Sequence, residues 1–320
     1  MNYLVTGIGA GLVSALLTAV VIKATPLAAV LYLLAPIPVL IVSLGWNHRS
    51  GLVAAVVGGL AIGVFLSPLS GLGFAVVTAL PAWWLAYLAL LGRPGPDGSM
   101  EWYPLGRLLA WAAGTAALTI VATAIISTGG DYEAFHRNAR EVAEAFVNLQ
   151  FPAGQSSFEG EIRDELIDLF ARLTPFLSAQ GFTTVLALYL WAAGRIVLIS
   201  KRLPRPWPRV SELQMPRSVG VVLALAIVLA SLDGFLSVFG FALAGALLMA
   251  FALQGLAAIH DRTLAKAGRP FLLTGLYLLI FMTQGVLMVA LSLFGIADTV
   301  LRLRRQPGPG SPKNPPTLST

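Results

Sequence analysis

Long apolar blocks recur along this chain, and they constrain its fold more than any other feature. A bilayer core about 30 Å thick needs about 20 apolar residues per helix, because backbone polar groups cannot stay unpaired in lipid. The blocks lie near residues 3–22, 27–45, 51–67, 71–91, 105–127, 176–199, 218–232, 235–258 and 271–295. The third and seventh are short for a full crossing. The sequence therefore predicts an all-α fold, a polytopic transmembrane bundle of eight or nine helices.

Composition supports this class and removes several kinds of chemistry. The mean hydropathy is +0.81, and only 11% of the residues are charged. The absence of cysteine excludes disulfides, thiolate nucleophiles and Cys-type metal sites. No GxxxxGK[ST] phosphate loop occurs, and His48, His136 and His260 lack any metal-binding spacing. We therefore predict that the chain is not an enzyme, has no ATPase of its own, and holds neither cofactor nor metal.

One segment, residues 128–175, breaks the apolar pattern. It contains nine of the fifteen carboxylates and four arginines, so its net charge is −5 while the whole chain carries +6. Apolar residues recur every three or four positions in two stretches, which predicts a pair of amphipathic helices joined by a turn: Tyr132, Phe135, Ala139, Val142, Phe146 and Leu149 in the first, and Ile162, Leu166, Leu169, Phe170 and Leu173 in the second. This extramembrane hairpin is either a solvated connector or a cap over the bundle.

Basic loops predict the orientation, since short loops rich in Lys and Arg stay in the cytoplasm. Loop 200–217 carries five cations against Glu212 alone, and 259–270 is also basic. With a cytoplasmic N-terminus these loops lie inside, and the acidic hairpin lies in the periplasm of a bacterial inner membrane. Nine crossings would place Arg302, Arg304 and Arg305 outside, whereas eight keep them inside, so the even count is favoured.

These patterns divide the chain into four parts. Residues 1–127 form a five-span half, and 128–175 form the periplasmic hairpin. Residues 176–305 form a half of three or four spans that contains the basic loop 200–217. Residues 306–320 are too rich in Pro and Gly to pack, which predicts a disordered tail.

Polar residues inside the spans are the candidate substrate contacts, because polar groups are costly in lipid. Gln284 lies near the middle of the last block and has no local hydrogen-bonding partner. We predict substrate-binding roles for Gln284, Gln254, Thr119 and Tyr189. A threonine in a helix also bonds its own backbone, and this is the alternative for Thr119.

Small residues four apart on the first span form a ridge that lets another helix approach closely. The ridge consists of Gly7, Gly11 and Ala15. We predict that it contacts a helix of a partner subunit, and internal packing is the alternative. Loop 200–217 includes Trp207 among its arginines, and contact with anionic lipid explains it more simply than nucleic acid does.

Several stretches resemble the YybS-like family of bacterial membrane proteins. They are the small-residue first span, APIPVL followed by a basic turn and a Gly-rich third span, QGLAAIH (254–260), and FGIADTVLRLRR (294–305). That family is distantly similar to the S components of energy-coupling factor transporters. The resemblance implies a substrate-binding protein whose first span contacts a transmembrane coupling subunit, with separate ATPases as further partners. S components have about six spans, fewer than this chain, and lack its acidic hairpin.

The function expected from these features is an inner-membrane transport or substrate-binding component. The alternative is a non-transporting assembly or scaffold protein that binds partners through loop 200–217. The lipid bilayer is a partner in both cases, and the substrate is an unidentified small molecule.

Overall fold

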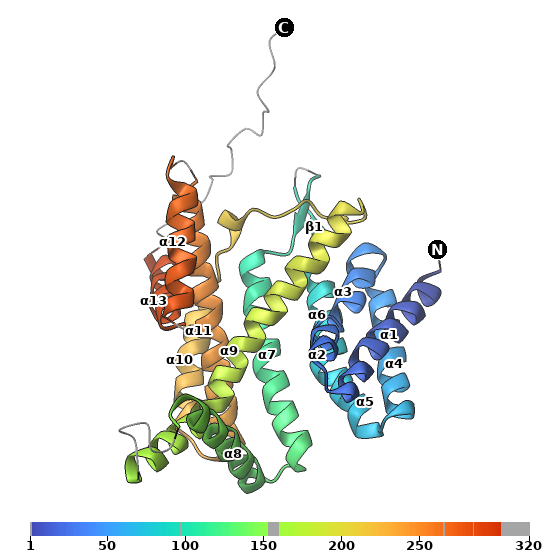
Figure 1. Ribbon diagram of the computed structural model, residues 1–320. Helices are drawn as coiled ribbons and strands as arrows, with labels where there is room; N and C mark the ends of the chain where they lie inside the picture. The colour runs from blue at the N-terminus through green and yellow to red at the C-terminus, as the bar shows by residue number, and fades with distance from the viewer. Residues whose placement is uncertain (1, 97, 153–159, 265, 284, 302–320) are drawn as a thin grey trace.

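The computed structural model describes residues 2–96, 98–152, 160–264, 266–283 and 285–301, and its described part is an almost wholly helical bundle (Figure 1). The α-helices are α1 (Tyr3–Ala19), α2 (Pro26–Leu33), α3 (Pro36–Gly45), α4 (His48–Phe65), α5 (Pro68–Phe74), α6 (Leu80–Ala89), α7 (Leu105–Thr128), α8 (Tyr132–Gln150), α9 (Glu161–Ile199), α10 (Ser218–Ala230), α11 (Gly234–Arg262), α12 (Arg269–Met282) and α13 (Val286–Leu301). Shorter elements are the 3₁₀ turns η1 (Val20–Lys23) and η3 (Val210–Glu212), the π turn η2 (Ala75–Ala79), and the paired strands β1 (Gly92–Pro94) and β2 (Met100–Trp102).

Seven helical segments are long and apolar enough to cross a membrane, which confirms the prediction of an all-α polytopic bundle. They are Tyr3–Lys23, Pro26–Gly45, His48–Phe65, Pro68–Ala89, Leu105–Thr128, Glu161–Ile199 and Gly234–Arg262. The apolar helices α10, α12 and α13 are shorter.

Prolines account for the breaks within two of these segments. Pro36 begins α3, where its missing N–H costs nothing, and the second segment therefore divides into α2 and α3. Pro81 cannot donate a bond to the carbonyl of Val77, and the helix widens into the π turn η2 just before it. Both breaks lie within apolar segments where a regular helix would satisfy every backbone group.

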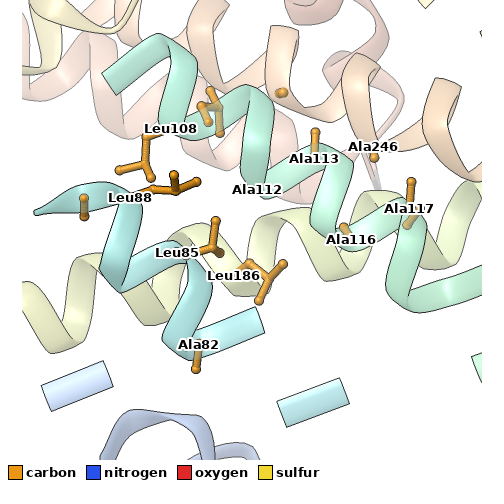
Figure 2. Packing of buried hydrophobic residues seen from close by; sticks show 14 of the residues in the cluster. Ala82, Leu85, Leu88, Leu108, Ala112, Ala113, Ala116, Ala117, Leu186 and Ala246 are labelled. Carbon is orange, nitrogen blue, oxygen red and sulfur yellow. The ribbon is translucent and has the colours of Figure 1, made fainter. Parts of the chain in front are cut away.

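The main core joins α3, α6, α7, α9, α10 and α11. Small residues dominate it, since Ala112, Ala113, Ala116 and Ala117 of α7 are buried between neighbouring helices. Figure 2 shows these alanines beside Leu85 and Leu88 of α6 and Leu186 of α9. Alanine lets helix axes approach closely, so dispersion contacts hold the helices together where lipid removes the hydrophobic driving force.

The acidic segment forms the predicted pair of helices, but its boundary and its packed face differ from the prediction. α9 runs without a break through Pro175, so the second amphipathic stretch and the sixth span are one helix of 39 residues. On α8 the buried residues are Ala139, Ala143 and Val147, which pack on Ile167 of α9. The predicted face is therefore rotated, because small residues allow the two helices to approach more closely than Phe146 would.

Side chains of the predicted apolar face remain accessible on this hairpin. Val142 is 61% exposed and Leu149 is 78% exposed. The first turn of α8 reaches the bundle, where the Tyr132 ring meets that of Phe235 with centroids 5.8 Å apart. The start of α8 thus packs on Phe235 of α11, whereas Val142 and Leu149 further along the helix stay accessible.

The ninth apolar block is two helices and not one. The chain reverses between α12 and α13, where Gly285 has a φ of +91° that favours glycine. Ser292 bonds to Leu248, and six residues further along both helices Asp298 bonds to Gln254. Residue numbers therefore increase in the same direction along α11 and α13. α13 therefore runs parallel to α11, and its last residue lies at the same end of the bundle as the last residue of α11.

Charge is divided between the two ends of the bundle. Loop 200–217 lies at the same end as β1 and β2, and the acidic α8 lies at the opposite end (Figure 1). We call these the basic end and the acidic end.

Candidate functional site

The basic loop 200–217 lies across the basic end of the bundle, and we call it the strap. Its contacts reach the ends of several helices: Arg202 over the Trp46 ring at 4.4 Å, Arg205 Nη1 donating to the Ala89 carbonyl at 2.8 Å, the Met215 N–H donating to Gln254 Oε1 at 2.9 Å, and Arg217 Nη2 donating to the Val300 carbonyl at 3.0 Å. The strap is therefore a folded part of the bundle.

Proline explains why the strap stays extended between its contacts. Pro204, Pro206 and Pro208 remove three backbone donors within five residues, so a regular helix cannot form there. Trp207 stands between two of them and packs on Gly194 of α9, where an added Cβ would lie 3.3 Å from the indole ring. The Arg195 guanidinium lies 5.2 Å from the centroid of the same ring. Trp207 thus holds the strap against α9 by packing on Gly194 and by its contact with Arg195.

An apolar cavity of about 260 Å³ lies beneath the strap. Its inner wall is buried side chains, and its outer wall is the strap. The lining residues are Leu44 of α3, Ala89 of α6, Leu105, Leu108, Leu109 and Ala112 of α7, Ala187, Leu190, Trp191 and Gly194 of α9, and Leu203, Arg205, Trp207, Pro208, Val210 and Leu213 of the strap. Trp191 is 58% exposed, so the cavity reaches the outer surface of an apolar helix.

Arg205 is the one charged residue in this lining. It is partly buried, and its Nε has no hydrogen-bond partner. Burial lowers the pKa of Arg205, while nearby Glu212 acts in the opposite direction. Among the described residues no carboxylate lies within ion-pair distance of it, and its guanidinium faces the Trp102 ring at 5.9 Å. The site thus combines an apolar cavity with a cation whose donors are incompletely used.

A polar cluster lies beside this cavity, centred on Gln254 of α11. Gln254 is fully buried, and each of its side-chain polar atoms is used inside the chain. Its Nε2 donates to Thr299 Oγ1 at 2.8 Å and to Asp298 Oδ2 at 2.9 Å. The cluster consists of Gln254, Asp298, Thr299 and the Met215 N–H, and it holds α11, α13 and the strap together. We call it the lock.

A second cavity of about 340 Å³ borders this cluster and has three charged residues in its lining. Its lining consists of Pro104, Arg107, Gln214, Met215, Pro216, Arg217, Asp298 and Thr299. Arg107 and Arg217 are exposed, whereas Asp298 is only 2% exposed. Two cations near one buried carboxylate suit water or a small ion, and Pro104, Met215 and Pro216 form the apolar part of the lining.

The structure does not bring the predicted substrate residues together. Gln254 lies in the lock, Thr119 is buried on α7, and Tyr189 is partly buried on α9. Neither cavity described above is lined by any of them. Gln284 lies outside the described residues, so its predicted role stays a prediction.

The small-residue ridge of α1 packs against α4 of the same chain. A Cβ at Gly7 would lie 2.7 Å from the Ser50 carbonyl, and one at Gly11 would lie 2.5 Å from the Ala54 carbonyl. Ala15 is buried in a small cluster with α4 and α5 residues. Internal packing thus uses the face that we predicted for a partner, and a coupling subunit would have to bind elsewhere on α1.

Sequence reasoning missed the cavity residues. Trp207 among prolines and arginines was one available signal, because an aromatic residue between prolines is typical of a segment that packs without regular structure. Gly194 and Leu109 gave none, since small and aliphatic residues are common throughout the spans. The cavity depends on contacts between segments that are far apart in the sequence.

Similarity to other proteins supports only the broad class. A family described as "Predicted membrane protein (DUF2232)" matches residues 12–299, so the chain belongs to that family. No curated protein and no solved structure matches the sequence.

Proposed function

We propose that this membrane protein is a binding or transport component for a small, predominantly apolar molecule, and that the cavity beneath the strap is its site. A ligand would lie between α7 and α9 with the strap as its cover. The proposal contains no catalytic step and requires no cofactor.

The observation that carries the proposal is the composition of the cavity wall. Most of its lining residues are Leu, Ala, Val or Trp, which is the kind of wall that binds an apolar molecule. Its volume of about 260 Å³ lies just below the roughly 300–1,000 Å³ of ordinary ligand sites. Leu108, Leu109 and Ala112 are buried, so the inner wall is preformed by the packed core.

Access from the bilayer supports a ligand that partitions into lipid. Trp191 borders the cavity from the outer face of α9, and an indole is favoured at the membrane interface. A molecule dissolved in the membrane would therefore reach the cavity past α9 without crossing water.

A neutral photoprobe tests this proposal. Purified full-length protein in lipid nanodiscs would be irradiated with a diazirine-bearing fatty alcohol, and the adducts mapped by peptide mass spectrometry. We expect adducts in 187–194 and 203–213. Ala187→Phe, which fills the cavity, should reduce them several-fold, whereas Leu188→Phe on the exposed side of the same turn should not. Adducts spread evenly over the outer helices and unchanged in Ala187→Phe would refute the proposal.

Dependence on a coupling subunit and separate ATPases is a further part of this proposal. What supports it is the exposed side of α1, where Val5, Leu12 and Leu16 point away from α4. Affinity purification after membrane cross-linking tests it. Retention of an ATPase that is lost on Leu12→Arg and Leu16→Arg would support the coupling role.

A non-transporting assembly role is the second candidate, and α12 is the observation that favours it. No residue of α12 is buried, although the helix is apolar and only 14 residues long. Such a helix has little packing of its own and offers a surface to another membrane protein. Substituting Phe271 and Phe281 by Ala should abolish a stable complex in this case without changing labelling of the cavity.

A further inference from the structure

Arg205 gives the cavity beneath the strap a chemical preference that its apolar wall alone does not. The side chain carries a permanent positive charge, since a guanidinium does not deprotonate in proteins. One of its five donors is used by the Ala89 carbonyl, and its Nε is buried with no acceptor. Leaving a buried donor of a charged group unpaired is costly.

No carboxylate of the described residues forms an ion pair with Arg205. The pairs within ion-pair distance in the described residues are Arg93 with Glu101 and Arg140 with Asp164 and Asp168, and none of them includes Arg205. Glu212 influences Arg205 only through longer-range attraction. A carboxylate or phosphate oxygen would accept from the free Nε and neutralise the charge, and guanidinium matches both anions geometrically.

The cavity extends from Arg205 toward the middle of the bundle. Ala112 lies seven residues after the start of α7, and Ala187 lies twelve residues before the end of α9. At a rise of 1.5 Å per residue these depths are about 10 Å and 18 Å from the basic end. The lining along this depth is apolar, so the charged part of a ligand would lie at the strap and a hydrocarbon part would point inward.

We propose that the ligand is an anionic amphiphile with one hydrocarbon chain, whose acidic group pairs with Arg205 while its chain fills the cavity between α7 and α9. The inference rests on the proposed function, since it specifies what the same cavity binds. The small volume favours a single chain over a two-chain lipid.

Three probes of matched chain length separate the outcomes. They are a diazirine-bearing fatty acid, the corresponding fatty alcohol, and a phosphatidic acid carrying the same diazirine chain. Each would be applied at pH 8 to the full-length protein in nanodiscs of zwitterionic lipid. Adducts in 187–194 and 203–213 would be quantified, and unlabelled acid or alcohol would compete for them.

We expect the unlabelled acid to compete at least tenfold better than the alcohol, which corresponds to about 1.4 kcal/mol. Arg205→Gln should bring the two competitors to equal potency, and Arg205→Lys should retain part of the difference. Arg209→Gln removes the same charge from an exposed position of the strap and should leave the preference intact. Labelling of Arg205→Gln by the alcohol shows that the cavity is still formed.

Other results overturn the inference in distinguishable ways. Equal competition by acid and alcohol in the unaltered protein, with labelling still in the cavity, refutes the anionic preference and leaves the proposed function standing. Stronger labelling by phosphatidic acid refutes the single-chain part and assigns the anion to a phospholipid. Absence of cavity labelling by every probe refutes the proposed function itself.

Discussion

The side-chain nitrogen of Gln254 lies 2.9 Å from Oδ2 of Asp298, and both residues are almost completely buried. Gln254 belongs to α11 and Asp298 to the parallel helix α13. The same amide group accepts the backbone N–H of Met215 in the strap. One side chain therefore holds together two helices and the segment that covers the cavity.

Gln254→Leu should destabilise the protein strongly. Leucine is similar in size, but it removes the buried acceptor of the Met215 N–H and the donor to Asp298 and Thr299. Each buried unsatisfied group costs about 1–3 kcal/mol. Thermal unfolding in detergent should show a lower midpoint, and Gln180→Leu at a partly exposed position of α9 is the matched control. Equal unfolding midpoints for the two variants would show that the hydrogen bonds of Gln254 do not stabilise the protein.

The parallel arrangement of α11 and α13 predicts which residues share a side of the membrane. The chain has no cysteine of its own, so single cysteines can be labelled with an impermeant maleimide. Cysteines replacing Leu264 and Leu301 should react from the same side, because both helices end at the basic end. A cysteine replacing Gln150, beyond the acidic end, should react from the other side. Labelling of Leu264 and Leu301 from opposite sides would show that α12 and α13 do not reverse as described.

The sequence predicted the class and most of the span boundaries because lipid imposes a simple rule on apolar length. The prediction of a single helix over block 271–295 was wrong, and the error has a physical cause. α12 and α13 are both apolar and only three residues separate them, so a hydropathy average over about 20 residues does not distinguish the two helices. The reversal depends on Gly285, and an isolated glycine in a span is common. The arginine-rich end after Leu301 was the better clue, since it favoured an even number of crossings.

The hairpin and the site show a second limit. Helical periodicity identified α8 correctly, but alanine at 139 and 143 decided which face packs, because the approach of two helices depends on size and not on hydropathy alone. The cavity could not be predicted from the sequence for a related reason. Leu44, Leu109 and Leu213 are ordinary residues, and only the fold places them around one space.

Gly11→Leu should disrupt the contact between α1 and α4. A side chain at Gly11 meets the backbone of Ala54, which cannot move as a flexible side chain can. Gly9→Leu adds the same side chain where nothing lies within 4 Å, so it controls for the effect of leucine on the helix itself. We expect a lower unfolding midpoint for Gly11→Leu alone. If Gly9→Leu is equally destabilised, the ridge does not matter for packing.

Val147→Asp should separate α8 from α9 without unfolding the membrane bundle. Val147 has no exposed surface and lies in the centre of the hairpin cluster, so a carboxylate there would be buried without a partner. Hydrogen exchange over 132–150 should become fast, while α11 stays protected. Val142→Asp makes the same substitution at a position that is 61% exposed and should leave exchange unchanged. Slow exchange in Val147→Asp would mean that other contacts hold α8.

Gly194→Leu should release the strap. A Cβ at this position already lies 3.3 Å from the Trp207 ring, and the rest of a leucine side chain occupies the space of the indole. Trp207 would then lose both its packing on α9 and its contact with the Arg195 guanidinium, which lies 5.2 Å away. Backbone amides of 203–213 should exchange faster, and labelling of the cavity by the fatty alcohol should fall. Gly181→Leu is the control on the same helix, because nothing lies within 4 Å of a Cβ there. Unchanged exchange in Gly194→Leu would show that Arg202, Arg205 and Met215 hold the strap without Trp207.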